Sequence, residues 1–205
     1  MRRRTVAFYR FFFYINRIMK KIKIGVFAGS LRKDSFCKKT ACSISAFMPD
    51  NFEMISVEIG GLALYNQDFD TEKNLPPAWA EFRQQIGNLD GFLFITPEYN
   101  RGVPAALKNA VDIASRPSGQ NLWDGKPGAI ISVTIGKLGA FGAYHALRQT
   151  LGFLNVLILN QPEMYLSSAD TLFNEEGELI NDGTRRFFGD FANQFAAWVT
   201  KMKKP

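Results

Sequence analysis

This chain of 205 residues has only two cysteines, Cys37 and Cys42, and a single histidine, His145. Two cysteines do not make the disulfide framework of a small secreted domain, and their spacing matches no zinc-binding signature. One histidine also argues against a histidine-rich metal site. No run of about eighteen uncharged apolar residues occurs, so the sequence predicts no transmembrane helix. We therefore expect a cytoplasmic globular protein from a reducing compartment.

Acidic residues are absent from the first eighteen positions, which contain five arginines. The formal net charge of the whole chain is +6, and subtracting these five arginines leaves +1 for residues 19–205. A nearly neutral body gives no reason to expect a nucleic-acid partner. Segment 1–18 could be a membrane-surface helix or an extension upstream of a true start at Met19. We predict that it lies outside the fold and that 19–205 is one domain.

Apolar, β-branched runs alternate with amphipathic segments along the rest of the chain. The apolar runs predict five strands, over 22–28, 52–59, 91–96, 128–135 and 156–160. The amphipathic segments predict five helices, over 35–48, 76–89, 104–115, 140–154 and 184–202. This alternation indicates an α/β protein with a doubly wound parallel sheet, in Rossmann-like or flavodoxin-like order. Both orders bind their ligand at the carboxyl ends of the strands.

The loop after the first predicted strand has the composition of a phosphate site. It reads GSLRKDSF over 29–36 and runs directly into a predicted helix, whose first N–H groups would lack partners within the helix. Ser30 and Ser35 add hydroxyl donors, and Arg32 adds positive charge. The loop is neither a dinucleotide fingerprint nor a Walker A motif. The alternative interpretation is an ordinary serine N-cap with solvated charges.

Two further loops at the same edge of the sheet could border a flat heterocycle. The loop after the third strand, 97–102, carries Tyr99 and Asn100, which offer an aromatic face and hydrogen-bonding groups. The loop after the fourth strand, 133–139, carries two glycines that allow close approach of the backbone. Each loop alone could be an ordinary surface turn. Their occurrence together at one edge favours a binding site.

Three segments follow the ends of the first, third and fourth strands: GSLRKDSF at 29–36, PEYNRGVPAALKNAVD at 97–112 and SVTIGKLGA at 132–140. They resemble the motifs of the NADPH-dependent FMN reductases, and most closely the flavodoxin-like quinone and chromate reductases. The likeness extends from about Lys21 to the last helix. It implies a flavodoxin-like five-stranded parallel sheet of order 2-1-3-4-5, with helices on both faces.

The resemblance also implies a set of FMN-binding residues, with no catalytic side chain and no metal. The set is Gly29, Ser30, Leu31, Arg32, Ser35, Phe36, Cys37, Pro97, Glu98, Tyr99, Asn100, Val133, Thr134 and Gly136. Two positions depart from the family pattern. Cys37 stands where relatives often have asparagine, so a donor to the phosphate would be lost. Ala140 stands where many have a second glycine, and its methyl group is expected to narrow the space for substrate.

By the same resemblance, the protein is an FMN-dependent NAD(P)H oxidoreductase. A hydride would pass from NADPH or NADH to N5 of FMN, and then to a quinone, flavin, azo or oxidised-metal acceptor in a ping-pong reaction. The resemblance to this family also implies that the chain associates with itself as a dimer or tetramer. Two other functions remain open: a flavodoxin-type electron carrier without NAD(P)H turnover, and a flavin-free interaction protein. Carriers are typically strongly acidic, so the near-neutral body favours the enzyme.

Overall fold

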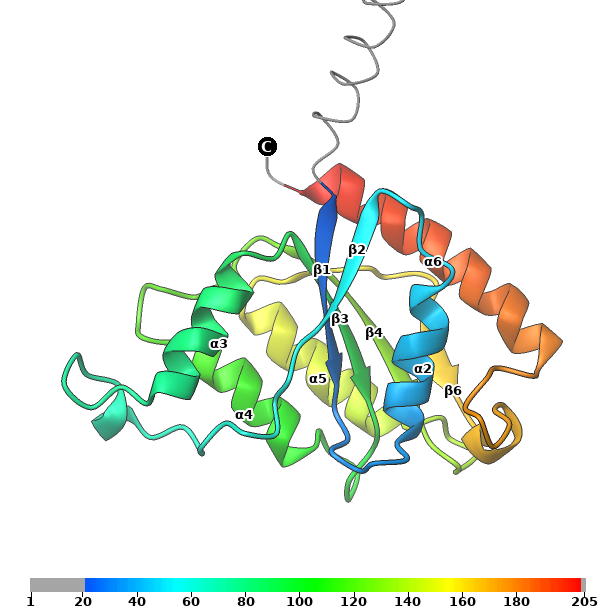
Figure 1. Ribbon diagram of the computed structural model, residues 1–205, viewed down its shortest axis with the longest axis horizontal. Helices are drawn as coiled ribbons and strands as arrows, with labels where there is room; N and C mark the ends of the chain where they lie inside the picture. The colour runs from blue at the N-terminus through cyan, green and yellow to red at the C-terminus, as the bar shows by residue number, and fades with distance from the viewer. Residues whose placement is uncertain (1–20, 204–205) are drawn as a thin grey trace, which may run out of the picture.

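A parallel β-sheet forms the middle layer of the protein, with helices on both of its faces (Figure 1). The computed structural model describes residues 21–203, so the predicted extension 1–18 lies outside the described residues. The sheet contains β1 (Ile22–Ala28), β2 (Phe52–Ser56), β3 (Gly91–Thr96), β4 (Pro127–Val133), β5 (Leu157–Ile158) and β6 (Met164–Leu166). The order β2-β1-β3-β4-β5 confirms the predicted flavodoxin-like topology.

The edge of the sheet beyond β4 differs from the prediction of one strand over 156–160. The two residues of β5 pair with the beginning of β4, and the three residues of β6 pair with its end. Both pairings are parallel, so two short strands share the fifth position. The described part of the chain therefore has six strands rather than five.

The helices divide between the two faces as right-handed crossovers require. Their bounds are α2 (Phe36–Ser45), α3 (Pro77–Gly87), α4 (Ala105–Ala114), α5 (Phe141–Phe153) and α6 (Asp182–Met202), with short 3₁₀ turns η1 (Gln67–Phe69) and η2 (Ala169–Thr171). One hydrophobic cluster joins the sheet to α2 and α6, and a second joins its other face to α3, α4 and α5. All five predicted helices are confirmed, with shorter bounds for most of them.

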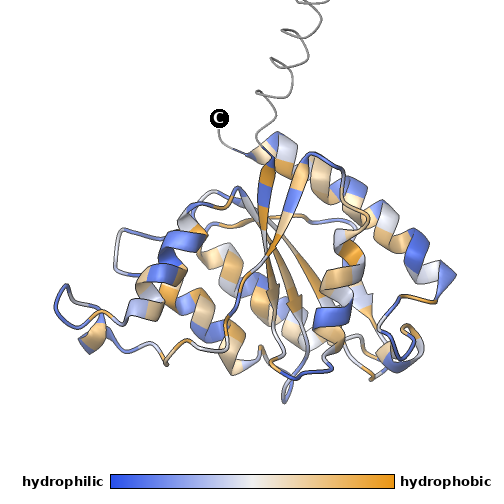
Figure 2. Cartoon of the chain, in the orientation of Figure 1, coloured by the Kyte–Doolittle hydropathy of each residue, from blue (hydrophilic) through white to orange (hydrophobic). Residues whose placement is uncertain are grey.

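The central strands are apolar because both of their faces are covered. Every residue of β3 and β4 is buried, and Figure 2 shows these strands as largely hydrophobic beside mixed helices. On the α3–α5 face, the rings of Phe27, Phe92 and Phe94 pack around Trp123, with ring centroids 4.8 to 5.7 Å from the indole. This rigid middle layer fixes the strand ends from which the site loops leave.

The long segment between β2 and α3 is held against α4 by polar side chains. Asn109, a buried residue of α4, accepts from the N–H of Tyr65 at 2.8 Å and donates to the carbonyl of Ala63 at 3.0 Å. Arg83 of α3 forms two parallel hydrogen bonds with Asp70, at 2.7 and 2.9 Å. These contacts give an otherwise irregular segment a defined path beside the site.

Candidate active site

The three predicted loops meet at the carboxyl ends of β1, β3 and β4. They surround a hollow of about 170 Å³, which we call the central hollow. Its lining is Ser30, Arg32, Ser35, Phe36, Cys37, Pro97, Glu98, Tyr99, Val133, Thr134 and Ile135. The structure thus brings ten of the predicted site residues together. The other four, Gly29, Leu31, Asn100 and Gly136, do not line it, and Gly29 and Leu31 line a neighbouring hollow instead. Ile135 lines the central hollow and was not predicted.

The first loop provides hydrogen-bond donors for an anion. Ser35 is the N-cap of α2, and its hydroxyl oxygen accepts from the N–H of Cys37 at 3.1 Å, which leaves the hydroxyl proton free to donate. Ser30 lines the central hollow and is 5% exposed, and no described residue accepts a hydrogen bond from its hydroxyl. The donors therefore fit a phosphate group.

Gly29 is needed because there is no room for a side chain, and not because of its backbone angles. A Cβ atom at this position would lie 3.0 Å from Pro97 and 3.1 Å from Leu107. Its N–H also donates to the carbonyl of Ile95 at 2.8 Å. The absent side chain therefore lets the end of β1 lie directly against β3 and α4, which sets the position of the first loop.

Cys37 lies beneath the first loop and is 1% exposed. Burial raises the pKa of its thiol to about 12, although contacts with Ser35 and the backbone of Ser30 oppose the rise. At neutral pH the thiol is therefore protonated and offers at most a weak donor. The expected effect of this departure from the family pattern, one fewer strong donor to phosphate, stays a prediction.

The loop after β3 is a tight reversal. Tyr99 and Gly102 exchange backbone hydrogen bonds of 3.1 and 2.9 Å, and the two residues between them, Asn100 and Arg101, have φ of 51° and 66°. Positive φ at both central positions is the geometry of a type I′ turn, which asparagine tolerates well. The turn holds the Tyr99 side chain, 48% exposed, at the rim of the central hollow.

Glu98 connects the loop after β3 to the start of α5. One carboxylate oxygen accepts from the N–H of Ala143 at 2.9 Å, and the other accepts from Arg101 at 3.0 Å. The residue before α5, Ala140, provides no side-chain cap, so Glu98 caps this helix from a different loop. A carboxylate at a helix N-terminus is also favoured by the helix dipole. Glu98 thus fixes two walls of the hollow relative to each other.

The loop after β4 contains two consecutive residues in the left-handed region. Gly139 and Ala140 both have φ of 60°, and a Cβ atom on Gly139 would lie 2.8 Å from Tyr165. Ala140 is 1% exposed and does not line the central hollow. Its methyl group therefore does not narrow this space as expected. Its effect is instead a backbone conformation that glycine adopts more easily.

A second hollow of about 470 Å³, the α4 hollow, adjoins the central hollow at Arg32 and Tyr99. Its lining is Gly29, Leu31, Arg32, Ile59, Gly60, Leu62, Leu64, Tyr99, Pro104, Ala105, Ala106 and Asn109. The central hollow is smaller than the roughly 300 Å³ or more that whole cofactors occupy, so a larger ligand must extend beyond it. Asn109 was not predicted as a site residue; the sequence feature that could have indicated it is a polar residue among apolar ones in the predicted helix 104–115.

The described residues contain no cluster of histidine, cysteine and carboxylate side chains able to hold a metal ion. Over the same residues, no helix is both long enough and apolar enough to span a bilayer. The lining of the central hollow combines serine and threonine hydroxyls, Arg32, Glu98, the Cys37 thiol and the ring of Tyr99. Such a lining fits an organic anion with a flat ring.

Comparison with known proteins agrees with this geometry. The family model for NADPH-dependent FMN reductase matches residues 22–171. A quinone reductase from Pseudomonas putida is 48% identical over 176 residues, covering 86% of this chain and 94% of the relative. A 2-hydroxy-1,4-benzoquinone reductase from Burkholderia sp. is 44% identical over 178 residues, covering 87% of this chain and 96% of the relative.

A solved structure of a flavoenzyme is also similar to this protein. The flavoenzyme NAD(P)H:(acceptor) oxidoreductase FerB from Paracoccus denitrificans aligns with a TM-score of 0.83 and 33% identity, covering 89% of this chain and all of FerB. The sheet order, the three converging loops and these similarities lead to one assignment. The chain belongs to the NADPH-dependent FMN reductase family.

Proposed function

We propose that this protein is an FMN-dependent NAD(P)H oxidoreductase whose small-molecule electron acceptor is a quinone. Family membership supports the flavin and the pyridine nucleotide, and the names of two relatives support the quinone. The observation that carries the proposal is that two serines, Ser30 and the N-cap Ser35, line the central hollow where helix α2 begins.

The first loop would hold the phosphate group of FMN. The hydroxyl groups of Ser30 and Ser35 can both donate, as can the N–H groups of the first turn of α2. Arg32, which makes no ion pair with a described residue, would neutralise part of the phosphate charge. Gly29 keeps this loop close to β3, so the phosphate lies next to the loop that carries Tyr99.

The loops after β3 and β4 would hold the ring. Pro97 and Tyr99 form one border of the hollow, and Val133 and Thr134 form the other. When bound, FMN supplies the chemistry that accepts a hydride from NAD(P)H and returns electrons to the acceptor. Backbone N–H groups of the two loops can donate to a ring edge that gains negative charge, as donors do in an oxyanion hole.

Neither Glu98 nor Cys37, the two acidic groups of the central hollow, is well placed to carry a proton. Both carboxylate oxygens of Glu98 accept hydrogen bonds within the protein. The Cys37 thiol, whose pKa burial raises to about 12, stays protonated at neutral pH. We therefore assign catalysis to binding, orientation and electrostatics. One site would serve donor and acceptor in turn, which is a ping-pong scheme.

We also propose a cytoplasmic location and self-association as a dimer or tetramer. The segment between β4 and α5 exposes Ile135 and Leu138, which are 64% and 62% exposed, and Phe141 at the start of α5 is 53% exposed. Several exposed apolar side chains close together in the sequence support contact with another copy. Light scattering after size-exclusion chromatography would give the mass of the assembly. No feature of the charge distribution suggests a nucleic-acid partner.

The function is tested with the purified full-length chain. We expect a yellow protein whose flavin absorbance at about 450 nm is lost under anaerobic NADPH and regained when a quinone is added. A flavin that NADPH cannot bleach would support an electron carrier instead. A colourless protein that takes up no added FMN would contradict the flavin site altogether.

A further inference from the structure

A third hollow borders the site and is not explained by a flavin. It has a volume of about 510 Å³, and we call it the β2 hollow. It shares Ser30 with the central hollow, and it shares Leu31, Ile59 and Gly60 with the α4 hollow. All three hollows therefore surround one short stretch, 30–32. A ligand that begins over the flavin site can reach the β2 hollow by passing Leu31.

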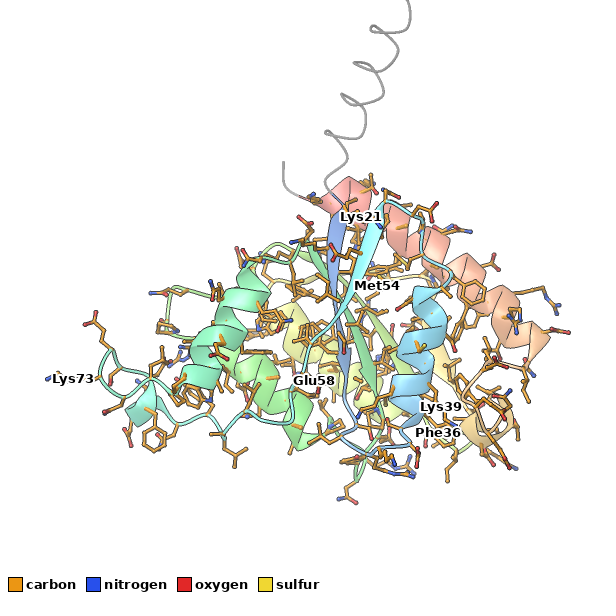
Figure 3. All side chains as sticks on the ribbon, viewed as in Figure 1. Lys21, Phe36, Lys39, Met54, Glu58 and Lys73 are labelled. Atoms are coloured by element: carbon orange, nitrogen blue, oxygen red, sulfur yellow. The ribbon has the colours of Figure 1, made fainter. Side chains whose placement is uncertain are left out.

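The β2 hollow lies between helix α2 and the strand β2 with the segment that follows it. Its lining is Val26, Ala28, Ser30, Leu31, Lys38, Ala41, Cys42, Ser45, Met54, Ser56, Val57, Glu58, Ile59 and Gly60. Figure 3 labels Met54 and Glu58 on the β2 side, with α2 beside them. The apolar part of the lining, its floor, includes Ala41 and Met54, which are partly buried, and Leu31, which is 51% exposed.

The rim of this hollow is polar. Ser45 and Ser56 line it, one on each wall, and the Ser45 hydroxyl donates to the carbonyl of Ala41 at 2.7 Å while its oxygen can still accept. Lys38, an exposed residue of α2, makes no ion pair or hydrogen bond with a described residue. Glu58, also exposed, lines the opposite wall. An apolar floor with hydroxyls, one free cation and one carboxylate fits a flat heterocycle that carries a sugar and an anionic group.

The proposed hydride donor has such an end. Its nicotinamide must approach the flavin, which leaves the adenosine end to be bound elsewhere. A purine can lie against Leu31 and Met54, and its amino group can donate to Glu58. The ribose hydroxyls can bond to the serines of the walls. The extra 2′-phosphate of NADPH, which NADH lacks, then has Lys38 as its cationic partner.

We propose that the β2 hollow binds the adenosine end of NADPH and that Lys38 distinguishes NADPH from NADH through the 2′-phosphate. This inference rests on the proposed function, because it requires a pyridine nucleotide as hydride donor. It assigns specificity to helix α2, which follows directly from the phosphate loop, so one element would contact both the flavin and its reductant. Lys38 contacts the substrate and not the reacting atoms.

The first test measures binding without turnover. Isothermal titration of the FMN-loaded protein with 2′,5′-ADP and with 5′-ADP gives the contribution of the 2′-phosphate. We expect Lys38→Gln to weaken 2′,5′-ADP binding about tenfold and to leave 5′-ADP unchanged within twofold. The matched control is Lys73→Gln, an exposed lysine far from the hollow in Figure 3, which should bind both as the wild type does. Equal binding of 2′,5′-ADP by Lys38→Gln and the wild type would overturn the proposal.

The second test places a large side chain in the β2 hollow and measures the KM for both nucleotides. Cys42→Phe should raise the KM for NADPH and for NADH at least fivefold while the Kd for FMN stays within twofold. Ala46→Phe, at the exposed end of the same helix and outside the hollow, should change none of these values. Unchanged KM values in Cys42→Phe would overturn the inference. A wild type that oxidises neither nucleotide would contradict the proposed function, whereas the titration still tests the hollow.

Discussion

The clearest quantitative prediction concerns Glu98, whose carboxylate joins the loop after β3 to the start of α5. Glu98→Ala removes the acceptor for the N–H of Ala143 and leaves the helix without a cap. Loss of an N-cap side chain costs about 0.5–2 kcal/mol. The ion pair with Arg101 adds little, because the Arg101 side chain is 73% exposed. We therefore expect a loss of about 1–2 kcal/mol in the free energy of unfolding.

The assay is thermal unfolding of the FMN-free protein followed by circular dichroism. A loss of 1–2 kcal/mol lowers Tm by about 2–8 °C in a chain of this size. The matched variant Glu98→Gln keeps an oxygen that can accept from Ala143, so it should recover at least half of the loss. The Kd for FMN should rise several-fold in Glu98→Ala, because two walls of the central hollow are no longer fixed relative to each other. An unchanged Tm in Glu98→Ala, or an equal loss in Glu98→Gln, would refute this reasoning.

Three further predictions use other contacts. Ser35→Ala combined with Arg32→Ala should weaken FMN binding at least about tenfold in a flavin-fluorescence titration, because charge-assisted phosphate contacts are lost; unchanged affinity would remove the phosphate assignment. Asp70→Asn should destabilise the protein by about 1–3 kcal/mol at pH 7, measured by urea unfolding. The hydrogen bonds from Arg83 hold the pKa of Asp70 below its ordinary value, so this contribution is present above about pH 4 and is lost as the pH falls further; a difference from the wild type that does not shrink as the pH falls below about 4 would contradict it. Ala140→Gly should raise the free energy of unfolding by about 0.5 kcal/mol, because relief of the left-handed conformation exceeds the added freedom of the unfolded chain; a lower Tm would disprove this.

The fold was largely predictable because its central strands are buried on both faces. The predicted bounds of β1 and β3 are confirmed to the residue, since each is a short apolar run that ends at a clear boundary. The strand β6 was not predicted, because three residues after a proline carry too little periodicity. Its existence depends on pairing with the end of β4, which is more than thirty residues away in the sequence.

The loops of the candidate site were predictable from the sequence, but the hydrogen bonds that join one loop to another were not. Ser30 and Ser35 follow a strand and open a helix, and such positions can be identified from local sequence. The cap from Glu98 to Ala143 joins residues 45 positions apart, and only the packed fold brings them together. The β2 hollow was not predicted either, because its walls come from a helix and a strand whose separation no sequence pattern specifies.

The division of the fifth strand position also affects how this protein meets other proteins. A sheet edge presents unpaired N–H and C=O groups that can recruit a strand from another molecule and begin aggregation. Here that edge consists of two residues at one end of β4 and three at the other, so it offers no long continuous row of such groups. The interruption therefore disfavours the pairing of this edge with a strand of another molecule. An uninterrupted strand made by redesign of residues 157–166 should lower the solubility of the protein.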